Sequence, residues 1–165
     1  MASVLQHPAI ERVRAALAES IGRAEIFELA ETARTAQDAA AALGIDVGQV
    51  ASSVVFGIPG NPDSTPLLVI TSGRHRVDTN LVSEFLGVKE LLRADAEFVR
   101  KWSGFAIGGV SPLAWTTTGV RIIIDVALSE YDVIWAAAGH PHAVFQTTYN
   151  QLVEITGATP LVVGN

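Results

Sequence analysis

The sequence predicts an α+β fold, a mixed sheet with helices on its outside. Strand-like apolar runs and helix-like amphipathic segments follow one another along the chain, without the strict alternation that is typical of a parallel α/β sheet. The 165 residues, of which 49% are hydrophobic, are enough for one domain with a substantial core. We therefore expect residues 1–165 to form a single domain whose N-terminal helix lies within residues 1–22.

The first third of the chain predicts two helices with a strand between them. Apolar residues recur at helical spacing over His7–Ser20, and a glycine follows as a stop signal. Ala24–Leu29 is a short strand-like run. Thr35 and Asp38 have the spacing of an N-cap and its partner, and they precede an alanine-rich helix that ends at a glycine.

The middle of the chain predicts a hairpin. Val47–Ser52 is expected to be a short turn or helical piece, and Ser53–Phe56 a strand. Gly57–Thr65 contains two glycines and two prolines between apolar runs, which is typical of a hairpin loop. The returning strand, Pro66–Thr71, is continuously apolar, which indicates burial on both faces.

The second half predicts further helices and strands around a polar turn and a glycine-rich loop. Ser72–Val77 is the polar turn, and Gly104–Pro112 is the loop. The expected helices are a segment ending at Phe85, Ala94–Trp102 and Tyr149–Thr156. The expected strands, with a turn at Gly139–His142 among them, are Arg121–Val126, Val133–Ala138, Ala143–Thr147 and a final strand or ordered tail at Thr159–Val163.

Composition excludes several classes of function. The chain has no cysteine, so disulfides, thiolate metal sites and a cysteine nucleophile are excluded. The net charge of −6 disfavours broad binding to long nucleic acids. We see no signal peptide and no apolar run long enough to span a membrane, so we expect a cytoplasmic protein without a membrane partner.

Familiar catalytic patterns are also missing. No nucleotide-binding glycine fingerprint occurs. His140 and His142 flank a proline, but no third ligand lies near them in the sequence, so we predict no metal. Ser111 follows two glycines, but Leu113 stands where a nucleophile elbow requires glycine.

Two features remain as candidates for chemistry. Gly108 and Gly109 allow a ligand to approach the main chain, and a loop of this kind can direct several N–H groups at one oxygen; the alternative is a buried turn. Asp125 lies in a very apolar strand, where a carboxylate must find partners. It either bonds a loop backbone or lines a site.

The order of the segments adds a resemblance. The chain resembles the YbaK family of aminoacyl-tRNA deacylases, which are related to the editing domain of bacterial prolyl-tRNA synthetases. The most specific match is the Gly-Gly-Val-Ser-Pro loop, and the other pieces are individually weak but stand in the right order. The resemblance covers residues 24–163 and rests on Thr35–Gly44, Gly48–Phe56, Val77–Leu81, Leu86–Gly87, Gly104–Leu113, Ile124–Asp125, Ala138–Gly139 and Leu152.

The resemblance implies a barrel-like mixed sheet and hydrolysis of the ester that joins a wrong amino acid to the tRNA 3′ end, without a cofactor. Cys-tRNA(Pro) or Ala-tRNA(Pro) is the substrate that the family suggests. The partners would be the aminoacyl-tRNA 3′ end and a prolyl-tRNA synthetase, with the chain a monomer or a homodimer. The resemblance places substrate-holding main chain at Gly108, Gly109, Val110, Ser111 and Pro112, a pocket wall at Ser52 and Ser53, and nearby residues at Asp125, Gly139 and His140.

One position departs from the family pattern. The family carries a lysine in the strand that opens the site, and Ser52 falls on it here. A serine hydroxyl is shorter and brings no positive charge. The chain therefore either deacylates by another arrangement, with Ser52, Gly108 and Gly109 at the reacting centre, or binds its ligand without cleaving it. Arg74 and Arg76 are the candidates to replace the charge and to contact tRNA.

Overall fold

The computed structural model describes residues 3–22, 25–30, 35–60 and 63–165. Eight strands form one mixed sheet in the order β1-β7-β6-β2-β3-β5-β8, and β4 pairs with β2 beside this path. The strands are β1 (Ile26–Glu28), β2 (Val50–Ile58), β3 (Thr65–Ser72), β4 (Leu92–Arg93), β5 (Arg121–Asp125), β6 (Ile134–His140), β7 (Ala143–Thr147) and β8 (Thr159–Leu161).

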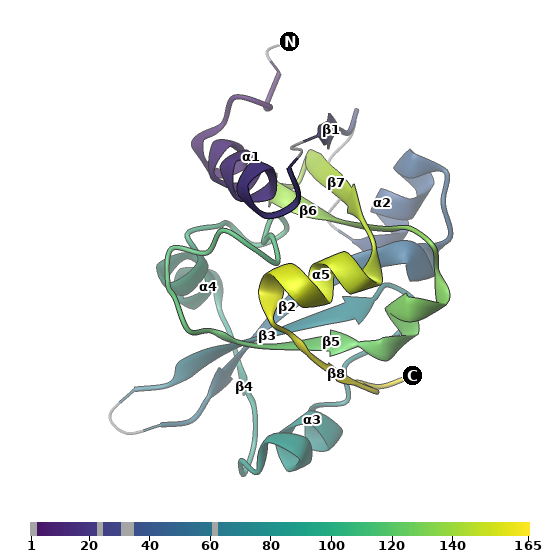
Figure 1. Cartoon of the computed structure of the whole chain (residues 1–165). Helices are drawn as coiled ribbons and strands as arrows, with labels where there is room; N and C mark the ends of the chain where they lie inside the picture. Colours follow the sequence, from purple (N-terminus) through teal and green to yellow (C-terminus); the bar gives the residue numbers. More distant parts are fainter. Residues whose placement is uncertain (1–2, 23–24, 31–34, 61–62) are drawn as a thin grey trace.

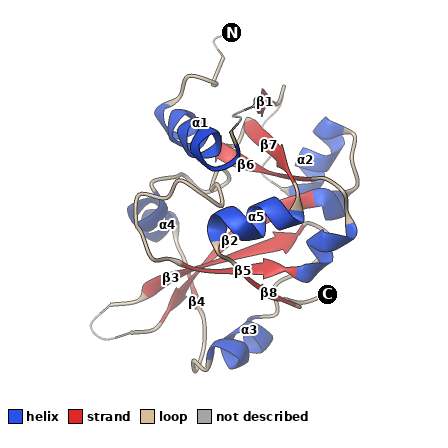
Figure 2. Ribbon diagram, viewed as in Figure 1, coloured by secondary structure: helices blue, strands red, loops and turns tan. Residues whose placement is uncertain are grey.

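The helices lie around the sheet (Figures 1 and 2). They are α1 (Pro8–Ile21), α2 (Ala36–Leu43), α3 (Thr79–Leu86), α4 (Ala96–Ser103) and α5 (Tyr149–Thr156), with short 3₁₀ turns η1 (Val47–Gln49) and η2 (Val126–Glu130). The predicted mixed sheet with outer helices is therefore confirmed. Among the described residues, no helix is long and apolar enough to cross a membrane.

Helix α1 begins and ends where its sequence signals lie. His7 is the N-cap, and its Nδ1 accepts the Ala9 N–H at 3.1 Å. Gly22 ends the helix in the left-handed conformation, with φ 74°. Ile10, Val13 and Leu17 are buried on the inner face, as the spacing predicts.

Strand β2 is longer than predicted. The segment expected as a turn over Val47–Ser52 is only the single turn η1, because Asp46 and Gln49 form a capping box that closes it. The strand therefore begins at Val50 and places Ser52 inside the sheet. It continues through Gly57 to Ile58, so the hairpin loop is shorter than expected; its residues 61–62 lie outside the described residues, as does Ala24 of the first predicted strand.

The sheet opens between β2 and β6. Along its whole length β2 pairs antiparallel with β3, but its parallel pairing with β6 ends after Val50–Trp135 and Ala51–Ala136. Beyond that point β6 stays with β7 and bulges between Ala137 and His140. His140 therefore still belongs to β6, and the predicted turn over Gly139–His142 is confined to its last two residues.

Candidate functional site

A cavity of about 480 Å³ lies where β2 and β6 separate. Strands β6 and β7 form one wall, and β2, helix α2 and the glycine-rich loop form the others. Its polar side chains come from Thr35, Ser52, Ser53 and His140. The remaining lining residues are Ala36, Ala39, Leu43, Val50, Ala51, Val54, Ile107, Gly108, Val110, Trp135, Ala136, Ala137, Pro141, Ala143 and Val144.

The β2 wall offers main chain that the described part of β6 does not pair, as well as two serines. The Val50 carbonyl accepts the Gly73 N–H at 2.8 Å on the β3 side. Because successive residues of a strand direct their N–H and C=O groups to opposite edges, Ser53 directs its own toward the side where β6 has separated. The Ser53 Oγ is also buried, and it has no hydrogen-bond partner among the described residues. A buried hydroxyl without a hydrogen-bond partner costs free energy in the folded protein.

The glycine-rich loop contributes N–H donors at Gly108 and Val110. Gly108 has φ 93°, in the left-handed region that favours glycine. In the described part of the chain, neither its N–H nor that of Val110 has a hydrogen-bond partner. Both residues line the cavity. Fixed main-chain N–H groups without a partner are the kind of donor that can stabilise a developing oxyanion.

Gly109 has a different position from its two neighbours. Its N–H donates to the Ala106 carbonyl at 3.0 Å, so that donor is already used in a turn. A Cβ at Gly109 would lie 2.7 Å from the His140 Cα. The residue therefore allows the loop to pack directly on the end of β6, and it does not line the cavity.

Ser111 and Pro112 form the C-terminal end of the glycine-rich loop. Both are buried, and neither lines the cavity. The Ser111 Oγ accepts the Leu113 N–H at 3.4 Å, and its carbonyl accepts the Trp115 Nε1–H at 2.8 Å. Of the five loop residues predicted to hold substrate, the structure brings Gly108 and Val110 to the cavity.

His140 is the titratable side chain among the described lining residues. Its Nδ1 accepts the His142 N–H at 3.1 Å. Burial, followed by the neighbouring His7 and His142, lowers the pKa of His140 from its ordinary 6.5, while Glu28 opposes them. His140 therefore presents a neutral imidazole at the wall near neutral pH.

Asp125 and Gly139 do not line the cavity. The Asp125 carboxylate accepts hydrogen bonds from the Ser72 and Ala127 N–H groups at 3.0 Å each, and it contacts His75 Nδ1 at 2.9 Å. The sequence left two roles open for Asp125, and the structure shows the one in which its carboxylate bonds main-chain N–H groups. A Cβ at Gly139 would meet the Ala9 carbonyl oxygen at 2.9 Å, so this glycine faces α1.

Arg74 and Arg76 also lie outside the cavity lining. Arg74 pairs with Glu130 and donates to the Tyr131 hydroxyl at 3.2 Å. The Arg76 N–H donates to the Asn165 carbonyl at 3.3 Å, and its side chain is exposed. No lysine or arginine stands among the described lining residues, so the positive charge that Ser52 lacks is not supplied by these two side chains.

Sequence reasoning missed the apolar walls. Trp135, Leu43 and Val144 line the cavity from β6, α2 and β7. Each lies in an ordinary apolar run, so no local signal separates it from a core residue. Within the described ranges, no three His, Cys, Asp or Glu side chains are placed to hold a metal ion.

Three proteins illustrate what the chain resembles. The crystal structure of a proposed trans-editing enzyme for prolyl-tRNA synthetase is 36% identical, with a TM-score of 0.83 over 96% of this chain and 98% of that one. The uncharacterized protein YwhH of Bacillus subtilis (strain 168) is 23% identical over 132 residues, which is 80% of this chain and 81% of YwhH. A proline–tRNA ligase of Limosilactobacillus fermentum is 32% identical over 94 residues, 56% of this chain but only 16% of the ligase.

A family model matches most of the chain. The model of the aminoacyl-tRNA editing domain matches residues 30–155, which contain every described residue that lines the cavity. The resemblance read from the glycine-rich loop and the order of segments is thereby confirmed. The chain belongs to the aminoacyl-tRNA editing domain family.

Proposed function

We propose that this chain acts in trans on mischarged tRNA, in the cytoplasm, and hydrolyses the ester between the amino acid and the terminal ribose. Cys-tRNA(Pro) and Ala-tRNA(Pro) are the substrates we propose, with a prolyl-tRNA synthetase as the source of the error. The observation that carries the proposal is that Ser52 and Ser53 line the same cavity as Gly108 and Val110. The apolar character of the other walls suits a small side chain without charge.

In the proposed reaction, a water oxygen bonds to the acyl carbon, and the bond from that carbon to the ribose oxygen breaks. The N–H groups of Gly108 and Val110 stabilise the oxyanion that forms on the acyl oxygen. The proton lost by the water ends on the ribose oxygen, and the neighbouring ribose hydroxyl assists its transfer. The products are the free amino acid and tRNA with both terminal hydroxyls restored. The protein mainly positions these groups.

A second candidate is a family member that binds aminoacyl-tRNA, an amino acid or a nucleotide without cleaving it. The observation that favours it is the absence of lysine and arginine from the described cavity lining, since Ser52 stands at the lysine position. In that case the cavity would retain its ligand specificity, but the rate of ester hydrolysis would stay at the uncatalysed level.

The deciding experiment measures release of the amino acid from a panel of mischarged tRNAs, including Ala-tRNA(Pro) and Cys-tRNA(Pro). The unmodified protein and Ser52→Lys are compared with Ser129→Lys, which adds the same charge at an exposed position on η2 outside the cavity. We expect turnover by the unmodified protein. Turnover by Ser52→Lys alone would favour the binder, and no turnover by any variant would refute the deacylase proposal.

A further inference from the structure

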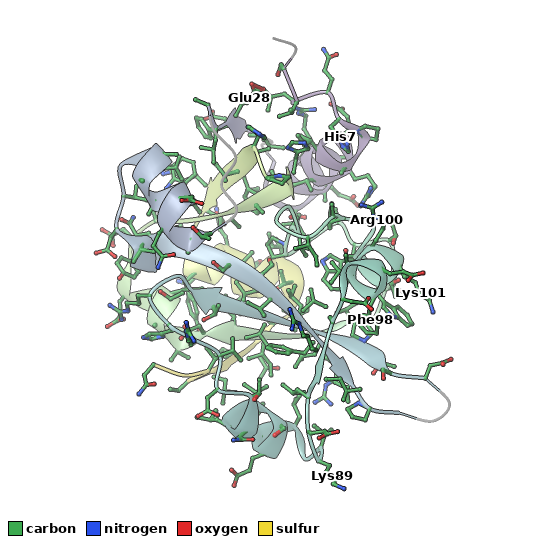
Figure 3. The ribbon with its side chains drawn as sticks, turned by 180° about the vertical axis from the view of Figure 1, so that it is seen from behind. His7, Glu28, Lys89, Phe98, Arg100 and Lys101 are labelled. Atoms are coloured by element: carbon green, nitrogen blue, oxygen red, sulfur yellow. The ribbon has the colours of Figure 1, made fainter. Side chains whose placement is uncertain are left out.

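A row of three histidine rings joins the N-terminal helix to the cavity wall. The ring centroids of His7 and His140 are 5.4 Å apart, and those of His140 and His142 are 5.5 Å apart. His7 caps α1, His140 ends β6 and lines the cavity, and His142 follows in the turn. Figure 3 shows His7 and Glu28 at the same end of the molecule. The proposed reaction gives no role to His7.

The hydrogen bonds of this row determine where the protons lie. Nδ1 of His140 accepts the His142 N–H, and Nδ1 of His7 accepts the Ala9 N–H, each at 3.1 Å. A ring nitrogen that accepts an N–H cannot carry a proton itself. Neutral His140 and neutral His7 therefore both carry their proton on Nε2. To gain a second proton, either ring must give up its main-chain hydrogen bond.

The packing of the main chain brings the rings together. A Cβ at Gly139 would lie 2.9 Å from the Ala9 carbonyl oxygen, so only glycine lets the first turn of α1 rest on β6 at this point. That contact places the N-cap residue directly over the last residue of β6. The approach of His7 to His140 is thus a consequence of how two elements pack, rather than of one free side-chain rotamer.

The charged groups around His140 act in opposite directions. Burial is the largest effect that lowers its pKa, and His7 on α1 and His142 in the turn lower it further. Glu28 on β1 raises it. The Glu28 carboxylate accepts hydrogen bonds from the Ser3 hydroxyl at 2.6 Å and from the Val4 N–H at 3.0 Å, which also lower its own pKa. The N-terminal segment therefore contacts both the cluster and Glu28, its acidic neighbour among the described residues.

We propose that His7 is a positioning residue for His140. Its ring packs against the His140 ring and, together with burial, favours the neutral form at the cavity wall, while the His142 N–H keeps the proton on Nε2, so that this N–H can donate to an oxygen of the aminoacyl ester. The donation to substrate rests on the proposed function, whereas the control of the His140 ring by His7 does not. The N-terminal helix is then part of the site, although it lies outside residues 30–155 of the family match.

The test is a ring titration of His140 by NMR in the unmodified protein, His7→Asn and His7→Asp. Both replacements are good N-caps, so α1 keeps its first turn. His140→Asn identifies the His140 signals. Because the neighbouring His7 lowers the pKa of His140, that pKa should rise in His7→Asn, and the negative charge in His7→Asp should raise it further. Glu11→Gln, which removes an exposed charge from the same turn of α1, should leave it unchanged.

For the same variants, kcat/KM is then measured across a range of pH on the mischarged tRNA that the unmodified protein hydrolyses. Protonated His140 cannot keep its present bond to His142, so the acid limb of kcat/KM should move to higher pH in parallel with the titration. An unchanged His140 titration in both variants, or a shifted titration with an unmoved acid limb, would overturn the proposal. If the unmodified protein hydrolyses no mischarged tRNA, the proposed function fails, and the titration alone decides whether His7 controls the ring.

Discussion

At the scale of single residues, the Ser53 hydroxyl is expected to affect stability and turnover in opposite directions. Its Oγ is buried without a described partner, so the folded protein gains nothing from the hydroxyl. We expect Ser53→Ala to raise the free energy of unfolding by about 1 kcal/mol and to weaken substrate turnover. Urea unfolding and the deacylation assay would measure the two effects.

Ser103 is the control for that prediction. It is also buried, but its Oγ donates to the Val99 carbonyl at 2.6 Å and accepts the Phe105 N–H at 3.0 Å. Ser103→Ala should therefore lower the free energy of unfolding by about 1–2 kcal/mol. If the two alanine variants changed stability in the same direction, the view of Ser53 as an unsatisfied group would be wrong.

Gly109 gives a second prediction at this scale. A Cβ there would lie 2.7–2.9 Å from three main-chain atoms of His140, and main chain cannot move aside as a flexible side chain can. We expect Gly109→Ala to cost about 1–3 kcal/mol and to reduce turnover, because the loop must lift away from β6. Denaturation curves and kcat/KM are the measurements.

Gly22→Ala is the control for Gly109→Ala, because it measures the cost of a left-handed backbone without a clash. Gly22 has φ 74°, and a Cβ there would meet nothing within 4 Å. Its cost should be about 1 kcal/mol, from the left-handed conformation alone, with turnover unchanged. A loss of turnover as large as that of Gly109→Ala would show that general destabilisation, and not loop position, explains the effect.

At the scale of elements, Asp125 joins β5 to η2 and to the end of β3. Its carboxylate accepts from two main-chain N–H groups and contacts His75. An amide in its place keeps only one accepting oxygen, so Asp125→Asn should lower the free energy of unfolding by about 2–4 kcal/mol. Asp125 does not line the cavity, so kcat/KM of the folded fraction should equal that of the unmodified protein.

Asp95→Asn is the matched control for the same chemical change. Asp95 caps α4 at an exposed position, where asparagine caps equally well. Its cost should stay below about 0.5 kcal/mol. An Asp125→Asn variant as stable as Asp95→Asn would contradict the role we give to the β5–η2 junction.

At the scale of the whole molecule, the lowered pKa of His140 makes stability depend on pH. In the unfolded chain the His140 ring takes up a proton near pH 6.5, whereas in the folded protein it does so only at lower pH. Below 6.5 the unfolded state therefore binds more protons, and stability falls with falling pH; above 6.5 both states are neutral and the contribution disappears. The lowered pKa of Glu28 also makes stability fall with falling pH, but only below the ordinary Glu pKa of 4.5.

Urea midpoints at pH 7.5 and pH 5.5 therefore isolate the histidine. The unmodified protein should lose more stability between the two values than His140→Asn does. Equal losses in the two proteins would mean that His140 is not held neutral by the fold. Far-UV circular dichroism would confirm that both proteins start from the same folded state.

The sequence by itself determined most of the helices and strands and the ends of α1 and α2, but not the start of β2 or the end of β6. Glycines in the left-handed conformation close the five helices of the described residues, and the Thr35 cap stands where its sequence signal predicts it, because these are interactions between residues close in the chain. The mixed sheet and the family were also predictable, from the order of segments and the Gly-Gly-Val-Ser-Pro loop.

Only the tertiary structure decided which residues share the cavity. Trp135, Leu43 and Val144 carry no local signal, and they meet only because β6 separates from β2 after a short parallel pairing. Asp125, Ser111 and the two arginines stay outside the cavity lining. The contact of His7 with His140 depends on two elements far apart in sequence whose main chains pack together at a glycine. Long-range packing of this kind has no signature in a local pattern, because each partner alone reads as an ordinary cap or turn residue.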